Sequence, residues 1–316
     1  MNFSELGKFF DEHDNYLILT HKNPDGDTLG CGFALCSYLR EIGKKVNVVN
    51  NDNFPARYDF LYEGYEPLDI EYETVIAVDI ADTQLLGDGL SEYAKEGCID
   101  LCIDHHISNK FYAKQTYLDG EASAACLVLY EFLKSCNANI SNHVAKCLYT
   151  GIATDTGCFK FENTTPKAHM AAAELMTYDI DFARINRLMF DIKSQGRLAV
   201  EQAVLSNIEY YSDGQCAMIV LTKELMESCG VEEAEFDGLA SMPLQIAGVR
   251  IGITVKQRDT DVFKLSVRTA EGVDACEFCA YFNGGGHIRA AGCEIVGSLE
   301  DVKAKVIAHV EKTLEH

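Results

Sequence analysis

Short β-rich runs alternate with helix-like stretches through the first half of the chain, and this alternation restricts the fold more than any other feature. Four runs rich in Val, Ile and Leu lie at residues 16–20, 46–49, 74–78 and 99–103. Helical spacing of apolar residues follows the first run, and further helices are predicted at 122–136, 142–154 and 165–177. Strands that alternate with helices form parallel sheets. The sequence therefore predicts an α/β fold with a parallel sheet in this half.

The second half of the chain has a different pattern. Residues 183–211 are amphipathic and predict helix, followed by strand patterns at 216–221, 249–256 and 264–269. A length of 316 residues suits two domains. We therefore expect a smaller α+β domain after the parallel-sheet domain. The predicted limits are 1–188 for the first domain, 189–211 for a helical connector, and 212–316 for the second domain.

Composition excludes several classes of protein. The chain has 27 Lys and Arg against 49 Asp and Glu, a net charge of −22, so it repels nucleic acid at long range and we expect no binding to duplex DNA. Its apolar runs fall short of the roughly 20 residues of a membrane helix, and its start has no signal-peptide pattern. We expect a cytoplasmic protein without membrane contact. Its 13 cysteines are expected to be reduced thiols, and Cys276 and Cys279 to share one apolar helix face.

Acidic and histidine residues collect where the predicted elements end. They follow the first, third and fourth strand runs and the helix at 142–154. In a parallel sheet, the ligand crevice lies outside the carboxyl ends of the strands, so these side chains should meet there. The set consists of His21, Asp25, Asp27, Asp79, Asp104, His105, His106 and Asp155.

So many carboxylates in one crevice require cations. Mixed carboxylate and imidazole ligands suit Mn²⁺, Fe or Zn better than Ca²⁺. The number of ligands allows two ions, with Asp79 as the bridge. The first ion would take His21 and Asp25, and the second would take Asp27, His105 and Asp155. Each motif alone has an ordinary explanation as a turn, a cap or a core histidine, but their coincidence at the ends of four elements favours a site.

A glycine-rich loop near the C-terminus forms a second candidate site. Residues 284–286 are three consecutive glycines, whose backbone N–H groups can approach a phosphate. The alanines that follow predict a helix, and His287, Arg289 and Arg268 add cationic groups. Arg250 and Lys256 are weaker candidates, because an exposed solvated charge explains each of them. A Gly-rich turn without a ligand is the alternative explanation of the loop.

Together these motifs resemble the DHH phosphoesterase superfamily in order and spacing. The resemblance rests on His-Lys-Asn-Pro-Asp-Gly-Asp at 21–27, Asp79, Asp-His-His at 104–106 and Gly-Ile-Ala-Thr-Asp-Thr-Gly at 151–157. The segment Asn-Gly-Gly-Gly-His-Ile-Arg-Ala-Ala-Gly at 283–292 resembles the loop of the DHH-associated C-terminal domain. Length and layout are similar to the NrnA-type subgroup of oligoribonucleases and pAp phosphatases. Cys31 and Asn283 depart from the residues common in the family, serine and glycine.

The resemblance implies a role for each candidate residue. His106 would contact the scissile phosphate, and Asp104 would orient the histidines. Two divalent ions would bind, with Mn²⁺ expected first and Mg²⁺ or Co²⁺ as alternatives. The implied metal ligands are His21, Asp25, Asp27, Asp79, His105 and Asp155. The implied substrate-binding residues are Arg268, Gly284, Gly285, Gly286, His287 and Arg289.

The implied activity is hydrolysis of short single-stranded oligoribonucleotides to mononucleotides, of 3′-phosphoadenosine 5′-phosphate (pAp) to AMP, or of both. A phosphodiesterase for cyclic or linear dinucleotides (c-di-AMP or pApA) would use the same residues. A family-II pyrophosphatase would share the metal ligands but lack the glycine loop, and a nucleotide-sensing protein without turnover is an alternative of another class. The sequence leaves open the preferred substrate, the cleavage polarity, the base preference, the physiological metal, the role of the cysteines and whether a homodimer forms.

Overall fold

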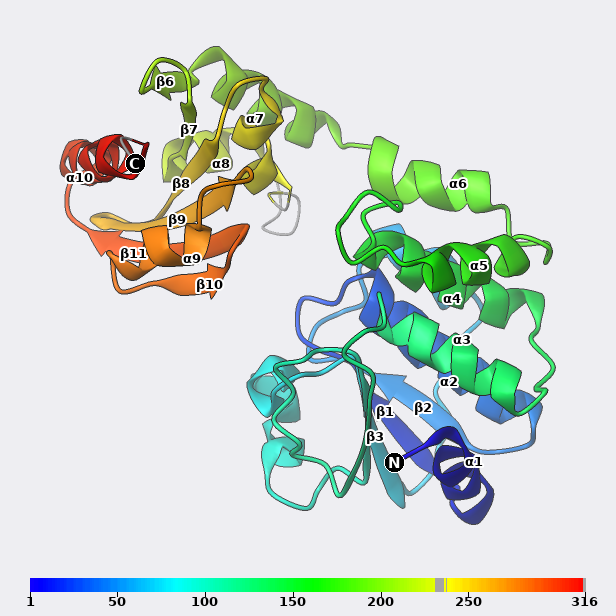
Figure 1. Ribbon diagram of the computed structural model, residues 1–316. Coiled ribbons are helices and arrows are strands. Elements are labelled where there is room, and N and C mark those ends of the chain that lie inside the picture. Colours follow the sequence, from blue (N-terminus) through cyan, green and yellow to red (C-terminus); the bar gives the residue numbers. More distant parts are fainter. Residues whose placement is uncertain (231–235, 237, 315–316) are drawn as a thin grey trace. The chain divides into compact units, whose positions relative to one another are not determined.

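The computed structural model describes residues 1–230, 236 and 238–314. The chain divides into two compact units, Met1–Ile192 and Lys193–His316, and each is described by itself (Figure 1). The prediction of an α/β parallel-sheet domain followed by a smaller α+β domain is confirmed.

A five-stranded parallel sheet forms the centre of the N-terminal unit. Its order is β2-β1-β3-β4-β5, and every neighbouring pair is parallel. The strands are β1 (Tyr16–Leu19), β2 (Val46–Val49), β3 (Thr74–Val78), β4 (Leu101–Asp104) and β5 (Gln115–Leu118). The sequence predicted the first four. It missed β5 because this edge strand is short and partly exposed, and so lacks an apolar run.

Helices cover one face of this sheet, and short 3₁₀ segments cover the other (Figure 1). Tyr16 and Ile18 pack toward the helices, while Leu17 and Leu19 pack toward the 3₁₀ segments. Because both faces of the sheet are buried, the strands appear in the sequence as continuous apolar runs. The helical segments are α1 (Phe3–Glu12), α2 (Gly26–Glu41), η1 (Ala56–Leu61), η2 (Thr83–Leu86), η3 (Asp88–Ala94), α3 (Ala125–Ser135), α4 (Asn142–Asp155), α5 (Pro166–Leu175), α6 (Phe182–Asn186) and the π-turn η4 (Arg187–Asp191).

The C-terminal unit contains a six-stranded mixed sheet. Its order is β10-β11-β9-β8-β7-β6; β7 and β8 are parallel, and the other pairs are antiparallel. The strands are β6 (Glu209–Tyr211), β7 (Cys216–Leu221), β8 (Ile251–Asp259), β9 (Val262–Thr269), β10 (Gly285–His287) and β11 (Ala290–Val296). The helical segments are α7 (Gln195–Ser206), α8 (Lys223–Cys229), η6 (Leu239–Ser241), η7 (Pro243–Gln245), α9 (Ala275–Ala280) and α10 (Leu299–Leu314).

Two segments differ from the helices that the sequence predicted. The segment 189–211 is not one helical connector: it holds the end of η4, a break, α7 and then β6, which pairs with β7. The alanines after the glycine loop begin strand β11 rather than a helix, so no helix dipole acts there. β11 pairs with β9 along its whole length, from Ala290↔Arg268 to Val296↔Val262, and this ladder outweighs the helix propensity of two alanines.

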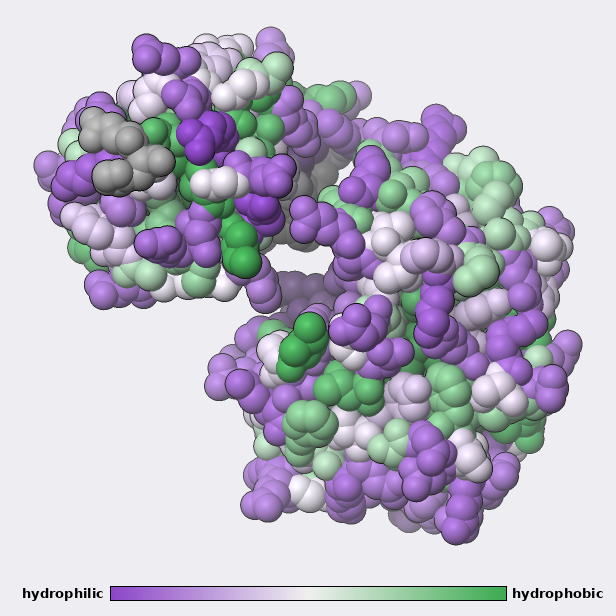
Figure 2. Space-filling view, in the orientation of Figure 1, coloured by the Kyte–Doolittle hydropathy of each residue, from purple (hydrophilic) through white to green (hydrophobic). Residues whose placement is uncertain are grey.

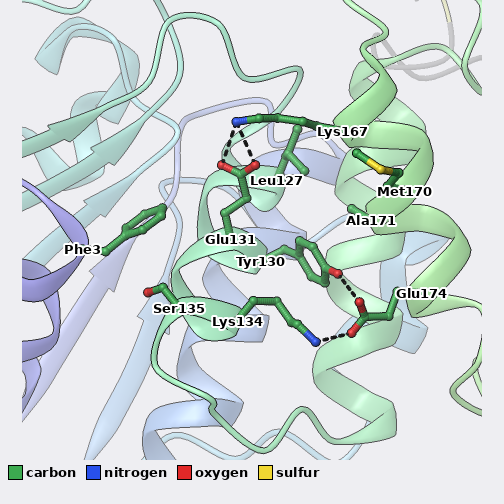
Figure 3. Close-up of a pocket in the computed structure, with 10 residues that line it drawn as sticks. All are labelled: Phe3, Leu127, Tyr130, Glu131, Lys134, Ser135, Lys167, Met170, Ala171 and Glu174. Atoms are coloured by element: carbon green, nitrogen blue, oxygen red, sulfur yellow. Dashed lines mark hydrogen bonds and ion pairs between the residues drawn. The ribbon is translucent and has the colours of Figure 1, made fainter.

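No helix within the described residues is long and apolar enough to cross a membrane. Figure 2 shows hydrophilic side chains spread over both units, with apolar side chains in smaller groups. A shallow groove lies between α3 and α5, bordered by Lys134–Glu174 and Lys167–Glu131 ion pairs (Figure 3). All 13 cysteines are unpaired, and most are buried.

Candidate metal centre and substrate-binding residues

The ends of several elements of the N-terminal unit converge on one cluster of carboxylates and imidazoles. Its ligand atoms form three groups, and the atoms of each group all lie within 4.8 Å of one another. The groups are His21, Asp25 and Asp79; Asp27, His105 and Asp155; and Asp79, His105 and His106. The first two groups match the two sets of ligands that the sequence suggested. Asp79 lies between them, because it also belongs to the group that contains His105.

Asp79 faces the two histidines with a different oxygen each. Its Oδ2 lies 3.6 Å from His21 Nε2, and its Oδ1 lies 3.5 Å from His105 Nε2. His105 Nε2 is 3.7 Å from Asp155 Oδ2 and 3.9 Å from Asp27 Oδ2. These distances are too long for hydrogen bonds. They suit neighbouring ligands of one ion, because two bonds of about 2.1 Å at 90–130° place their donor atoms roughly 3–3.8 Å apart.

One oxygen of the Asp79 carboxylate also lacks a hydrogen-bond donor. Its side chain is buried, and Oδ1 makes no hydrogen bond with any residue that the structure describes, although His106 Nδ1 lies 3.5 Å away. A buried acceptor without a partner costs about 1–3 kcal/mol, and more when it is charged. The backbone at Asp79 has φ 59°, a left-handed conformation that Asp and Asn tolerate better than most residues. The residues present therefore fit a bound cation at this carboxylate.

In the rings of His21 and His105, one nitrogen makes a hydrogen bond and the other is free to bind a metal ion. His21 Nδ1 lies 2.9 Å from the Lys22 carbonyl, and His105 Nδ1 lies 3.1 Å from the Ala122 carbonyl. A carbonyl only accepts, so Nδ1 must carry the proton in both rings. In the neutral imidazole, Nε2 then keeps its lone pair and faces the carboxylates. This arrangement orients metal-binding histidines in many proteins.

Asp25 and Asp27 serve as helix caps as well as candidate ligands. Asp25 Oδ1 accepts hydrogen bonds from the backbone N–H groups of Asp27 and Thr28 at the start of α2. The carboxylate of Asp27 is buried and accepts from Ala125 N at 2.6 Å and Cys126 N at 2.9 Å. It thereby caps α3, whose own N-cap side chain makes no such bond. The cap interpretation of this motif and the ligand interpretation are therefore compatible.

Asp104 is fully buried and orients His106. Its Oδ1 accepts from His106 Nδ1 at 2.8 Å and from the backbone N–H groups of His105 and His106. Its Oδ2 accepts from Asn109 Nδ2 at 2.6 Å. Burial alone would raise the pKa of Asp104, but hydrogen bonds from His106 and Asn109 outweigh it, and the pKa is lowered. The Nε2 atom of His106 is not engaged by Asp104, and the side chain is 42% exposed.

Without cations, the cluster holds protons. Burial would lower the pKa of His21, but the Asp25 and Asp79 carboxylates outweigh it and raise that pKa to about 11. The pKa of His105 rises to about 10 in the same way, despite burial, through Asp79 and Asp27. Burial and nearby carboxylates raise the pKa of Asp155 to about 7. Divalent ions binding here would displace these protons, so their affinity should increase with pH.

Two asparagines support the cluster, and the sequence did not single them out. Asn109 is buried and holds Asp104, while its Oδ1 accepts from the backbone N–H of Phe111 at 2.7 Å. Asn163 Nδ2 donates to the Asp155 carbonyl at 3.1 Å and lies 3.4 Å from Asp155 Oδ2. Asn109 lies five residues after Asp104, and Asn163 lies eight residues after Asp155. This short distance along the chain is their only signal in the sequence.

The C-terminal unit places Arg268 and His287 on one face of its sheet. Arg268 pairs with Ala290 across β9 and β11, and Ala290 pairs with His287 across β11 and β10. Directly paired residues point to the same face, so these two side chains share a face about 10 Å apart, two strand spacings. Arg268 is partly buried, makes a hydrogen bond to the Val267 carbonyl, and has no ion pair within the described residues.

Arg289 and the glycines have structural roles that the sequence did not predict. Arg289 Nη1 donates to the Ala270 carbonyl at 2.7 Å, so this guanidinium holds a turn. A Cβ at Gly284 would lie 2.3 Å from the Gly292 carbonyl oxygen, and one at Gly286 would lie 2.6 Å from the Ala290 carbonyl oxygen. These two glycines let β10 lie close to β11. Gly285 alone has open space beside it, on the exposed edge of the sheet.

Comparisons with known proteins agree with this architecture. The "DHH family, N-terminal domain" matches residues 15–152, and the "DHHA1 domain" matches residues 218–316. A Thermus thermophilus protein named bifunctional oligoribonuclease and PAP phosphatase NrnA is 30% identical over 310 residues, covering 94% of this chain and 89% of the relative. A Streptococcus mutans protein named a probable enzyme of the same kind is 30% identical over 285 residues, covering 89% of each chain.

One solved structure is similar along nearly the whole chain. It is an exopolyphosphatase-related protein from Bacteroides fragilis, with a TM-score of 0.85 and 27% identity, covering 99% of this chain and 95% of that one. The fold and the site define a class of two-domain α/β proteins that carry an Asp and His cluster at the ends of their parallel strands. The chain belongs to the DHH family and carries the DHHA1 domain.

Proposed function

We propose that this protein hydrolyses phosphoester bonds of short oligoribonucleotides and of pAp, with two divalent ions, Mn²⁺ first among them. The observation that carries this proposal is the position of Asp79, whose two oxygens face two separate groups of ligands while Oδ1 makes no hydrogen bond within the described residues. A carboxylate in that position is suited to bridge two cations. The oligoribonuclease and pAp phosphatase names of the relatives support the choice of substrate.

Each residue of the cluster has a distinct task in this proposal. His21 and Asp25 hold one ion, and Asp27, His105 and Asp155 hold the other. Bound at such a site, divalent ions would supply Lewis-acid stabilisation of phosphoryl oxygens and would lower the pKa of a water molecule that serves as the nucleophile.

His106 contacts the phosphoryl group rather than a metal ion. Its Nδ1–H is committed to Asp104, which leaves Nε2 on an exposed ring beside the cluster. Asp104 fixes the orientation of this ring and does not touch substrate.

The substrate is small because of the charge balance. A net charge of −22 repels a long polyanion, and long single strands require an extended basic track. Arg268 and His287 provide a local cationic site, on which we expect a further phosphate of the substrate to bind. Absence of duplex DNA binding, a homodimer and a cytoplasmic location stay predictions.

Product analysis tests the proposal directly. The purified protein with Mn²⁺ is given RNA of two, five, ten and 24 nucleotides, pAp, c-di-AMP and pyrophosphate, each with and without a chelator. We expect mononucleotides or AMP, with a rate per bond that falls steeply between about five and about ten nucleotides, more so at low salt. Turnover of c-di-AMP or pyrophosphate alone, processive digestion of the 24-mer, or binding without turnover would each contradict the proposal.

Arg268→Ala should raise KM with little change in kcat. Loss of one charged hydrogen bond to a phosphate costs about 1.5–3 kcal/mol, or roughly 10- to 150-fold in KM. A small chromogenic phosphodiester, which carries no second phosphate, should be cleaved at the normal rate. The control is Lys264→Ala, because Lys264 lies on the same face of β9, is exposed and carries the same charge. Equal losses in both variants, or on both substrates, would contradict a phosphate contact at Arg268.

A further inference from the structure

An exposed aromatic ring lies in the loop that follows the candidate metal ligand Asp155. Phe161 follows Asp155 by six residues, and 60% of it is exposed. The loop also holds Phe159, whose ring stacks on His169 at 5.0 Å and packs against the core. Within the described residues Phe161 has no ring contact of this kind. One aromatic residue therefore anchors the loop, and the other remains open to solvent.

Hydrogen bonds hold the loop against Asp155 at both ends. The backbone N–H of Phe161 donates to the Thr156 carbonyl at 3.0 Å, and Asn163 Nδ2 donates to the Asp155 carbonyl at 3.1 Å. The backbone N–H of Phe159 donates to Thr156 Oγ1 at 3.1 Å. Because Phe161 and Asn163 are tied to Asp155 and its neighbour, the backbone at Phe161 stays close to a candidate metal ligand.

The backbone of this loop is strained just before Phe161. Gly157, Cys158 and Phe159 have φ of 56°, 59° and 62°, all in the left-handed region, and two of them are not glycine. Such residues cost free energy and persist where surrounding contacts impose them, often at functional sites. A Cβ at Gly157 would lie 2.4–2.6 Å from three carbons of the Phe161 ring. Only glycine at 157 allows the edge of the ring to occupy that space.

We propose that the Phe161 ring stacks on the nucleobase of the nucleotide whose phosphate reaches the metal centre. This inference rests on the proposed function, since it names the group that the site recognises beyond the phosphate. Nucleobases stack on aromatic side chains with little sequence preference, because every base has a π-face. An exposed apolar ring in the loop that follows a candidate metal ligand suits that partner. Phe161 is then a specificity-determining residue, which favours nucleotides over other phosphate esters.

The test compares substrates that differ only in the base. Wild type, Phe161→Ala and Phe161→Trp are assayed on pAp and pApA and on the same compounds lacking their bases. Wild type should have a kcat/KM roughly tenfold or more higher for the nucleotide than for its abasic counterpart. Phe161→Ala should lose this preference through KM, with the abasic rate unchanged, and Phe161→Trp should keep it. Met170→Ala is the matched control, because Met170 is a similarly exposed apolar side chain on α5 and should leave the preference intact.

The outcomes separate this inference from the proposed function. If wild type hydrolyses the nucleotides but shows no preference for the base, or if Phe161→Ala keeps the preference, stacking at Phe161 is wrong while the phosphoesterase proposal stands. Equal losses of Phe161→Ala on nucleotide and abasic substrates would assign the ring to loop structure and also overturn stacking. If wild type hydrolyses none of the four compounds, the proposed function itself fails.

Discussion

Asp79→Asn should lower turnover by on the order of a thousandfold or more and reduce bound Mn²⁺ to fewer than two ions per chain. The amide keeps the size of the side chain and tolerates the left-handed backbone at φ 59°, so the fold should survive. It removes the negative charge that two neighbouring cations would share. Turnover of pAp and metal content after dialysis measure the two effects. Asp79→Ala should behave similarly.

Thermal unfolding distinguishes this loss from damage to the fold. In the metal-free protein, Asp79→Asn removes a carboxylate that pairs with the protonated His21 and His105, so its melting temperature should fall modestly. In wild type, Mn²⁺ should raise the melting temperature by mass action, and the variant should lose most of that rise. Asp82→Asn is the control, because Asp82 caps η2 three residues further on and lies outside the cluster. Two tightly bound ions and near-normal turnover in Asp79→Asn would refute the bridge.

Asp104→Asn should reduce kcat by roughly 10²- to 10⁴-fold while two ions remain bound, as expected when a histidine loses its orienting carboxylate. In neither orientation can the new amide accept all the hydrogen bonds that the Asp104 carboxylate accepts. An NH₂ group at the position of Oδ1 faces the N–H groups of His105 and His106, and at the position of Oδ2 it faces Asn109 Nδ2. Asn109 cannot turn its own oxygen there without leaving the Phe111 N–H unpaired. Steady-state kinetics on pAp and metal analysis measure the outcome.

A double variant separates hydrogen-bond geometry from charge. When Asp104→Asn is combined with Asn109→Asp, the new amide at position 104 can donate to the new carboxylate at position 109, while the amide oxygen accepts from His106. The second carboxylate oxygen at position 109 accepts from the Phe111 N–H. We expect the double variant to regain part of the activity and most of the stability that the single variant loses. No recovery at all would mean that the negative charge at position 104, and not the orientation of His106, is what matters.

The site residues that could be predicted from the sequence are those that lie at the ends of predicted strands and helices. The six proposed metal ligands follow the ends of predicted strands and one helix, and parallel strands bring such ends together wherever the sheet forms. Asn109 and Asn163 lie outside any periodic pattern, and their contacts with Asp104 and Asp155 depend on how two loops fold back. The sequence has no local signal for that.

The C-terminal domain shows the limit of local pattern more clearly. The alanines at 290 and 291 favour helix by propensity, but pairing with β9 places them in a strand. Arg289 looked like a phosphate ligand beside a glycine loop, and in the structure its guanidinium binds the carbonyls of a turn. Propensity and proximity in sequence are weak against a ladder of backbone hydrogen bonds made with a strand far away in the chain.

The amino-acid sequence was sufficient to predict the class of fold, the parallel sheet, and the collection of carboxylates and histidines at its edge. It was sufficient because hydrophobic periodicity sets the elements, and topology then places their ends. Three features of the site emerged only from the folded chain: Asp79 has an unpaired buried oxygen between two groups of ligands, Asp27 caps α3, and Phe161 stands exposed beside Asp155. The first two features depend on contacts between segments far apart in the chain, and the third depends on the left-handed backbone at residues 157–159. No local sequence pattern records this geometry.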